Sequence, residues 1–228
     1  MTHIKTMKKI LLFSFLMINI AFEANAQYDF VAKKIIPNGH LKIKTLKNKF
    51  ITNQRSNIYY SKLSNPKFPL EYIDDGNCGK FVIKNKTFPL KDFFETELAC
   101  DLDLTAYKVY QFRFKRHQYY ALECINKGSR TSFILIHLFE VGKQSIYYYP
   151  LWSRYGSINC IGDFNKDGNL DFLKIRNNED QTGKDTFKAT IMSLNHSQHI
   201  FKDLNNSEAW YFRKTYINDN LIDIKMLK

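Results

Sequence analysis

The sequence predicts an all-β protein, mainly antiparallel, with one short helix, in the form of a β-sandwich or a partial propeller-like sheet. The aromatic content is 15%, mostly from 19 Phe and 14 Tyr, and aromatic and β-branched side chains fit pleated, half-buried strands. Short strand-like runs separated by polar turns recur along the chain, which is typical of antiparallel sheets. No linker or low-complexity stretch interrupts residues 27–228, so we expect a single β-rich domain there.

The first 26 residues have the three parts of a secretory signal peptide. These are a basic head with Lys8 and Lys9, an apolar run over residues 10–22 and an Ala-Asn-Ala exit at residues 24–26. The apolar run is shorter than the roughly 20 residues that span a bilayer. We therefore expect cleavage after Ala26, a secreted or periplasmic location, and no transmembrane segment in the released chain.

Before residue 100 the patterning is weak, and few elements can be placed. Residues 27–65 are rich in Lys and Asn and are expected to hold one or two strands. Residues 74–77, Asp-Asp-Gly-Asn, have turn chemistry and precede a strand-like run at 80–84. Residues 90–98 are the short-helix candidate, because their apolar side chains at 90, 93, 94 and 98 fall close to one helical stripe.

From residue 107 onward the strand pattern is clear. Tyr110, Phe112 and Phe114 alternate with polar residues, which is the period of a half-buried strand. Residues 131–140 form a nearly continuous apolar run, which predicts a strand buried on both faces. Strands are predicted in chain order over residues 107–114, 119–125, 131–140, 145–151, 157–161, 170–176, 186–194, 210–217 and 221–227.

Four cysteines follow the signal peptide: Cys78, Cys100, Cys124 and Cys160. An even number in an exported chain favours disulfide bridges, and three pairings are possible. The preferred pairing joins Cys78 to Cys100, closing a local excursion, and Cys124 to Cys160, which lie in strand-like runs that could be neighbours. The alternative is four buried free thiols acting as small apolar side chains.

The chain carries a formal charge of +12 at pH 7. Such a charge suits nucleic acid, an anionic cell surface or an acidic polysaccharide as a partner. Export argues against nucleic acid, so a glycan or another exported protein is the expected partner. Most lysines are dispersed along the chain, which is also ordinary for a solvated surface.

One loop, residues 163–171, has oxygen-bearing residues at the spacing of a calcium site. Calcium takes about six to eight oxygen ligands and accepts carboxylates, amides and backbone carbonyls together. Gly168, at the sixth position of the loop, permits the sharp turn that brings alternate side chains together. The expected ligands are Asp163, Asn165, Asp167, Asn169 through its backbone carbonyl, and Asp171.

This loop is not an EF-hand, because its twelfth position is Lys174 rather than the bidentate Glu that an EF-hand requires. Residues 162–173, Gly-Asp-Phe-Asn-Lys-Asp-Gly-Asn-Leu-Asp-Phe-Leu, resemble the calcium loop of FG-GAP and VCBS repeats. Members of that family pair two strands around the loop, often as propeller blades in exported or cell-surface proteins. The resemblance therefore implies a structural calcium ion held by the five residues above.

The resemblance covers only about 20 residues, from 157 to 176, and occurs once. A propeller would show its repeat several times at a steady period, so a metal loop is implied and a complete propeller is not. An ordinary hairpin is the alternative, since Lys-Asp-Gly-Asn at 166–169 is good turn chemistry without an ion. A turn, however, does not need Asp163, Asn165 and Asp171 at ligand spacing.

No catalytic motif accompanies the loop. The sequence contains no Gly-x-Ser-x-Gly, no His-Glu-x-x-His and no phosphate-binding glycine loop. His137 lies in the apolar run and is interpreted as a core residue. The tyrosines at 147–149, with Trp152 and Trp210, suit either sugar stacking or core packing.

These observations favour a non-enzymatic exported binding or structural module, stiffened by calcium and by disulfides. One alternative is a secreted hydrolase acting on polysaccharide or protein, because two catalytic carboxylates need not be close in sequence. Another is a periplasmic inhibitor or partner of a second exported protein. Paired carboxylates facing an open cleft would favour the hydrolase, whereas a face of exposed aromatic side chains would favour a binding protein.

Overall fold

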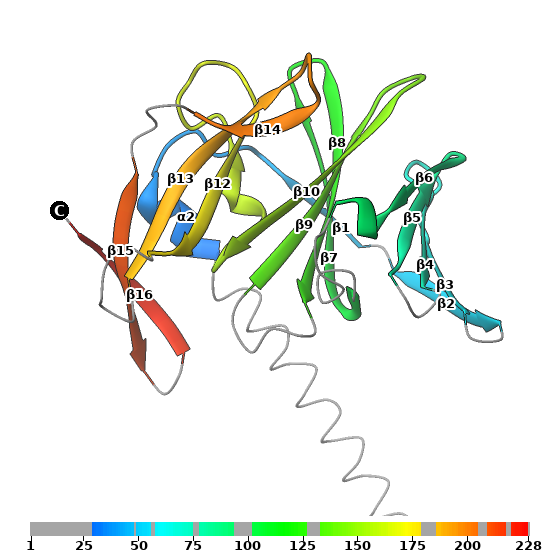
Figure 1. The fold of residues 1–228 in the computed structure, drawn as a ribbon, viewed down its shortest axis with the longest axis horizontal. Helices are drawn as coiled ribbons and strands as arrows, with labels where there is room; N and C mark the ends of the chain where they lie inside the picture. Colours follow the sequence, from blue (N-terminus) through cyan, green and yellow to red (C-terminus); the bar gives the residue numbers. More distant parts are fainter. Residues whose placement is uncertain are drawn as a thin grey trace, which may run out of the picture.

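Three antiparallel β-sheets make up the protein in its computed structural model (Figure 1). The structure describes residues 29–47, 49–55, 58–74, 78–93, 102–126, 133–178, 186–204, 209–217 and 220–227. The expected signal peptide, residues 1–26, lies outside these ranges. Over the described ranges, no helix is long and apolar enough to cross a membrane. The prediction of an all-β, mainly antiparallel fold is confirmed, in the form of stacked sheets.

The central sheet has five strands in the order β1-β7-β8-β9-β10, and each neighbouring pair is antiparallel. Its four long strands are those that the sequence pattern predicted between residues 107 and 151. Their bounds are β7 (Leu102–Phe114), β8 (His117–Asn126), β9 (Phe133–Val141) and β10 (Ile146–Arg154), and the short edge strand is β1 (Lys44–Leu46).

The second sheet has the order β11-β12-β13-β15-β16, and β14 also pairs with β13. Its strands agree closely with the last four predicted runs. The bounds are β11 (Ile161–Gly162), β12 (Asp171–Asn177), β13 (Thr186–Asn195), β14 (Ile200–Asp203), β15 (Trp210–Ile217) and β16 (Asn220–Leu227).

The third sheet is a meander, in which each strand pairs with the next along the chain. It lies in the part of the chain where the sequence pattern was weak, so only the run at 80–84 was placed, besides one or two strands expected without bounds over residues 27–65. The bounds are β2 (Phe50–Arg55), β3 (Ile58–Leu63), β4 (Leu70–Asp74), β5 (Lys80–Ile83) and β6 (Lys86–Pro89).

Side chains of the central sheet point alternately toward the other two sheets. Tyr119 and Ala121 of β8 pack in the apolar cluster shared with the second sheet. Tyr120 and Leu122 pack in the cluster shared with the third sheet. On β9, residues 134–140 are all buried, which confirms the strand predicted to be covered on both faces.

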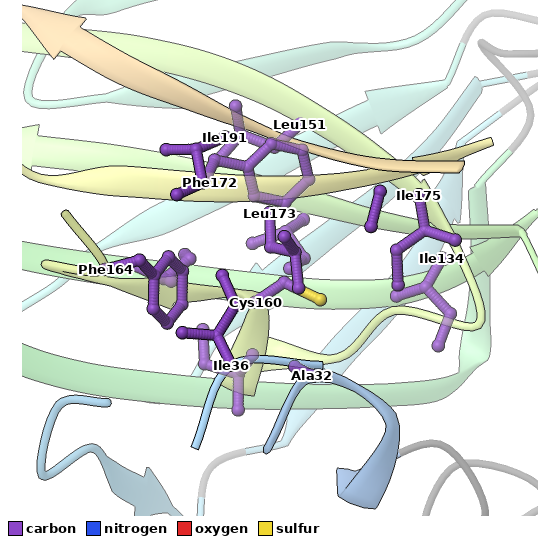
Figure 2. Packing of buried hydrophobic residues seen from close by; sticks show 14 of the residues in the cluster. Ala32, Ile36, Ile134, Leu151, Cys160, Phe164, Phe172, Leu173, Ile175 and Ile191 are labelled. Carbon is purple, nitrogen blue, oxygen red and sulfur yellow. The ribbon is translucent and has the colours of Figure 1, made fainter. Parts of the chain in front are cut away.

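The larger cluster fills the space between the central and second sheets. Figure 2 shows Ile134 of β9 and Leu151 of β10 in the same cluster as Leu173 and Ile175 of β12. Burial of an aliphatic or aromatic side chain of this size contributes about 1.5–3 kcal/mol. This packing fixes β12 against β10, and β12 begins at the last residue of the predicted metal loop.

Helix α2 (Asp29–Ile35) covers part of the same cluster and was not predicted from the sequence. Val31, Ala32 and Ile35 are buried on one side of the helix. Lys34 lies in the last turn, where a positive charge is favourable, and forms an ion pair with Asp223 of β16. Seven residues make barely two turns, so a helical stripe could not stand out in the sequence.

Two predicted elements differ from the structure in detail. The helix expected at 90–98 begins as a single 3₁₀ turn, η1 (Leu90–Asp92), and residues 94–100 lie outside the described ranges. The strand expected at 157–161 is mostly a 3₁₀ turn, η3 (Ile158–Cys160), followed by the short β11. The Ser157 hydroxyl accepts a hydrogen bond from the Asn159 N–H, and this local bond competes with strand pairing.

The preferred disulfide pairing is wrong for Cys124 and Cys160, which are buried and are not disulfide-bonded. Cys124 points from β8 into the cluster shared with the third sheet, whereas Cys160 lies in the cluster shared with the second sheet. The central sheet separates the two thiols, and a disulfide requires close approach of both Cβ atoms. Cys78 is disulfide-bonded, and its expected partner, Cys100, lies outside the described residues.

The buried His137 gives a first testable prediction, on acid stability. Its Nδ1 lies 2.7 Å from the Tyr148 hydroxyl, and burial lowers the pKa of His137 to about 3. Below about pH 6.5 the unfolded chain therefore gains a proton that the folded chain does not bind until near pH 3. Stability falls as pH drops through this window, by roughly 3 kcal/mol at pH 4 for this residue alone.

We expect the His137→Asn variant to lose less stability than the wild type when the pH is lowered, because it lacks the contribution of His137. The unfolding free energies of the wild type and the variant are measured by urea denaturation at pH 7.5 and at pH 4. The variant's value is subtracted from the wild-type value at each pH. That difference should shrink by roughly 3 kcal/mol at the lower pH. A difference that is the same at both pH values would contradict a neutral, desolvated His137.

Candidate metal loop, histidine cluster and ligand groove

The predicted calcium loop connects β11 to β12 at one end of the second sheet. Gly162 pairs with Asp171, so the chain leaves and re-enters the sheet at adjacent positions. The Asp163 N–H donates to the Gly39 carbonyl at 2.9 Å, which ties the loop to the segment after α2. Phe164 is buried with its ring edge-on to His40, so the first part of the loop is anchored in the core.

Asp171 holds the two ends of the loop together. Its side chain is fully buried, and its Oδ2 accepts the backbone N–H groups of Phe164 at 2.8 Å and Asn165 at 3.3 Å. Its Oδ1 accepts the hydroxyl of Ser193 on β13. Burial raises the pKa of the Asp171 carboxyl, although these hydrogen bonds oppose the rise. The carboxylate thus joins the loop to the neighbouring strand.

The exposed half of the loop is folded by its own side chains. Asp167 Oδ1 accepts the Asn169 N–H at 2.7 Å, and its Oδ2 accepts the Asn165 side-chain amide at 2.9 Å. Asp163 Oδ1 accepts the Gly168 N–H at 3.3 Å, and the positive φ of 81° at Gly168 suits a residue without a side chain. Oxygens of the expected ligands are therefore directed toward the backbone of the loop.

The negative charge of the loop is partly balanced by a lysine. Burial alone would raise the pKa of Asp167, but hydrogen bonds from Asn169 and Asn165 and the positive charge of Lys115 outweigh it and lower that pKa. Lys115 comes from the β7–β8 turn, and its Nζ would lie 2.8 Å from a Cβ added to Gly168. An ammonium group is thus already placed beside the carboxylates.

The donor set of the loop fits calcium, because three carboxylates, an amide and a backbone carbonyl are hard oxygen ligands. Four of the five expected ligands lie in the loop itself, and Asp171 is the first residue of β12. The loop carboxylates are not gathered as tightly as a second cluster, described next, whose ligand atoms lie within 4.8 Å of one another. A bound calcium ion would accordingly compete with the N–H groups for these oxygens.

The second cluster consists of His117, Glu140 and His196, and sequence reasoning missed it. The three come from the start of β8, the end of β9 and the β13–β14 turn, so no local spacing could reveal them. His117 Nδ1 lies 2.5 Å from Glu140 Oε1, and His196 Nδ1 lies 4.0 Å from Glu140 Oε2. The two imidazole rings are stacked, with centroids 4.8 Å apart.

Glu140 is buried and is surrounded by hydroxyl donors. Tyr149 donates to its Oε2 at 2.9 Å, and Tyr119 lies 3.5 Å from the same oxygen. Burial, followed by the charge and hydrogen bond of Glu140, raises the pKa of both tyrosines. Burial lowers the pKa of His196, with Glu140 acting in the opposite direction. A carboxylate with fixed hydroxyl donors therefore faces an imidazole that favours its neutral form.

A groove of about 360 Å³ lies along β10, where the central sheet ends and the second sheet begins. In Figure 1, β10 and β12 lie close together at one end and diverge toward the other. Trp152 is 36% exposed, and Lys174 Nζ lies 4.5 Å from its ring centroid. The lining is mostly apolar and aromatic: Phe93, Tyr148, Tyr149, Pro150, Leu151, Trp152, Phe172, Lys174, Met192, Gln198, His199, Ile200 and Phe201.

The structure separates the aromatic residues that the sequence offered for sugar stacking. Tyr148 and Tyr149 are buried and line the inner groove. Tyr147 stacks on His199, with ring centroids 3.4 Å apart, and Trp210 packs against the larger apolar cluster. Trp152 is therefore the member of this set best placed to meet a ligand in the groove.

Comparison of the chain with protein-family models, with curated proteins and with solved structures finds no match. The function is accordingly inferred from the loop, the histidine cluster and the groove. The groove and the histidine cluster adjoin, since Tyr149 lines the groove and also donates a hydrogen bond to Glu140.

The bonds of Asp171 predict a stability difference within the loop. Asp171→Ala should lower the unfolding free energy by about 2–4 kcal/mol even with chelator present, because three donors lose a buried acceptor. Asp167→Ala, at an exposed position, should cost less than about 1 kcal/mol under the same conditions. Urea denaturation of both variants measures the difference. Equal losses would show that Asp171 is not the anchor of the loop.

Proposed function

We propose that this protein is an exported, non-catalytic binding module that holds a glycan in the groove beside β10 and a structural calcium ion in loop 163–171. The observation that carries the proposal is the half-exposed Trp152, which is held at the groove by the ammonium group of Lys174. An exposed indole ring offers a flat apolar face that packs against the C–H face of a sugar ring. The groove volume lies within the usual range for small-ligand sites.

The polar groups at the groove suit hydroxyl and carboxylate substituents. Lys174 lies on one side of Trp152, and Gln198 and His199 come from the β13–β14 turn. Gln198 is exposed, so its amide is open to solvent and to a bound sugar. The formal charge of +12 further favours acidic over neutral glycans by long-range attraction.

Pro150 favours a sugar over an added peptide strand as the ligand. β10 ends the strand order of the central sheet, and its edge lines the groove. Proline has no N–H, so it cannot donate to an incoming strand and is a residue that blunts sheet edges. Strand addition depends on an unbroken row of backbone donors and acceptors. The side chains at the groove are therefore the main recognition groups.

Calcium would support the groove from one side. Asp171 begins β12, which also supplies Phe172 and Lys174 to the groove. Its bond to Ser193 fixes β12 to β13, the strand that supplies Met192. An ion held by the loop residues would offset their three carboxylate charges and restrain the start of β12. The resemblance of the loop to FG-GAP and VCBS repeats supports this role.

The glycan proposal predicts that Trp152→Ala reduces sugar binding. A glycan array, followed by calorimetry with the strongest acidic and neutral hits, measures this effect. We expect a loss of affinity of tenfold or more, since one aromatic stacking contact is worth about 1–3 kcal/mol. Lys174→Gln should weaken the binding of acidic glycans more than the binding of neutral ones. Tyr59→Ala is the matched control, because Tyr59 is an exposed aromatic residue on the third sheet.

The groove would not be a glycan-binding site if the array gave no hits, or if the wild type and the Trp152→Ala variant bound glycans with equal affinity. Release of reducing ends from a bound polysaccharide would replace the binding module with the hydrolase alternative. Circular dichroism of each variant ensures that lost affinity is not lost folding.

The calcium part of the proposal predicts a metal-dependent melting temperature. Calcium at 100 times its dissociation constant should stabilise the fold by about 2.7 kcal/mol, which raises the melting temperature by several degrees. Asp167→Asn should abolish the calcium increment while barely changing the melt in chelator. Differential scanning calorimetry with calcium and with chelator tests this, and superimposed wild-type curves would end the calcium assignment.

A further inference from the structure

We propose that His117, Glu140 and His196 form a second metal site, one that selects a divalent transition ion and fits zinc best. Two imidazoles and one carboxylate are a ligand set that zinc accepts in proteins, with a fourth position open to water or a ligand. Calcium disfavours nitrogen ligands and prefers a larger shell of oxygens. The two sites would therefore take different ions.

The first observation is a buried imidazole nitrogen of His196 that has no hydrogen-bond partner. His196 Nδ1 is buried and has no hydrogen-bond partner, although Glu140 Oε2 lies 4.0 Å from it. An unsatisfied buried polar atom costs about 1–3 kcal/mol. A cation between the two atoms would satisfy both, since a neutral imidazole offers a lone pair on this nitrogen.

The second observation is that the ligand atoms already converge. The ligand atoms of His117, Glu140 and His196 all lie within 4.8 Å of one another. Ligand atoms about 2.0–2.1 Å from a tetrahedral zinc ion lie roughly 3.3 Å apart. To bind zinc, His196 Nδ1 and Glu140 Oε2, now 4.0 Å apart, would move slightly closer together. His117 Nδ1 and Glu140 Oε1, now 2.5 Å apart, would move apart by a similar amount.

The third observation is the set of groups that hold Glu140 in place. Tyr149 donates to Glu140 Oε2 at 2.9 Å, with Tyr119 at 3.5 Å. Metal ligands are commonly oriented by hydrogen bonds of this kind, and loss of such a partner typically weakens metal binding about 10–100-fold. Glu140 is thus buried, restrained and directed toward both imidazoles.

The site would also join two parts of the molecule. His117 and Glu140 belong to the central sheet, whereas His196 belongs to the β13–β14 turn of the second sheet. Figure 1 shows this turn and the β7–β8 turn at the same end of the molecule. Gln198, His199 and Ile200, in or next to the β13–β14 turn, line the groove. A bound ion would therefore fix one wall of the groove.

Titration with zinc, in buffer containing saturating calcium, tests the proposal on the purified protein. Calorimetry should give one zinc ion per chain, and cobalt in its place should give the visible absorption bands of a nitrogen- and oxygen-ligated ion. His196→Ala should weaken zinc binding at least 100-fold and abolish those bands. Tyr149→Phe, which keeps all three ligands, should weaken it about tenfold.

His40→Ala is the control, because it removes a half-buried histidine that contacts none of the proposed ligands and bonds instead to the carbonyls of Ile36 and Asn159. Its zinc affinity should stay within about threefold of the wild type. The proposal is overturned by the absence of zinc binding, by unchanged affinity in His196→Ala, or by equal losses in His196→Ala and His40→Ala. A loss of zinc binding in Asp167→Asn but not in His196→Ala would move the ion to the loop and also overturn it.

Discussion

The burial of the central sheet on both faces is the constraint on which the rest of the structure depends. Its strands must carry apolar side chains at successive positions, as β9 does from residue 134 to 139 apart from His137. Each neighbouring sheet is then held by one set of alternate side chains, so the two apolar clusters do not compete for the same residues. As a consequence, any polar side chain within β8 or β9 needs a hydrogen-bond partner inside the protein. Glu123, for example, accepts a hydrogen bond from the N–H of Ile158.

Two buried carboxylates, Glu140 and Asp171, lie at the ends of their strands. Glu140 lies at the end of β9, where the sheets separate enough to admit His117 and His196. Asp171 plays the corresponding part at the start of β12, where it is buried yet fully engaged by donors. Both carboxylates are held by groups from other elements, which is how a fold positions charges without leaving them unpaired.

Much of the second half of the chain could be predicted because its burial follows a simple period. Alternation identified β7 and β8, and an unbroken apolar run identified β9 as covered on both sides. Oxygen spacing located loop 163–171, although its backbone bonds, such as those of Asp171 to Phe164 and Asn165, could not be read from spacing. The hydrophobic pattern predicted burial correctly where the environment of a residue depended only on its position along a strand.

The failures arose where long-range arrangement decides the outcome. The Cys124–Cys160 pairing failed because sequence separation does not say which face of a sheet a side chain occupies. The histidine cluster was missed because its members come from three distant segments. Helix α2 was missed because its seven residues are stabilised by packing on a distant sheet, and short helices gain little from propensity alone.

The separation of the Cys124 and Cys160 thiols by the central sheet has a consequence for the order of folding. In an oxidising compartment every cysteine of the unfolded chain is open to exchange with the others. Folding of a β-rich domain takes about milliseconds to seconds, whereas uncatalysed disulfide exchange takes about seconds to hours. Early assembly of the central sheet would enclose Cys124 and Cys160 on opposite sides before they react, leaving Cys78 to be oxidised without competition from either.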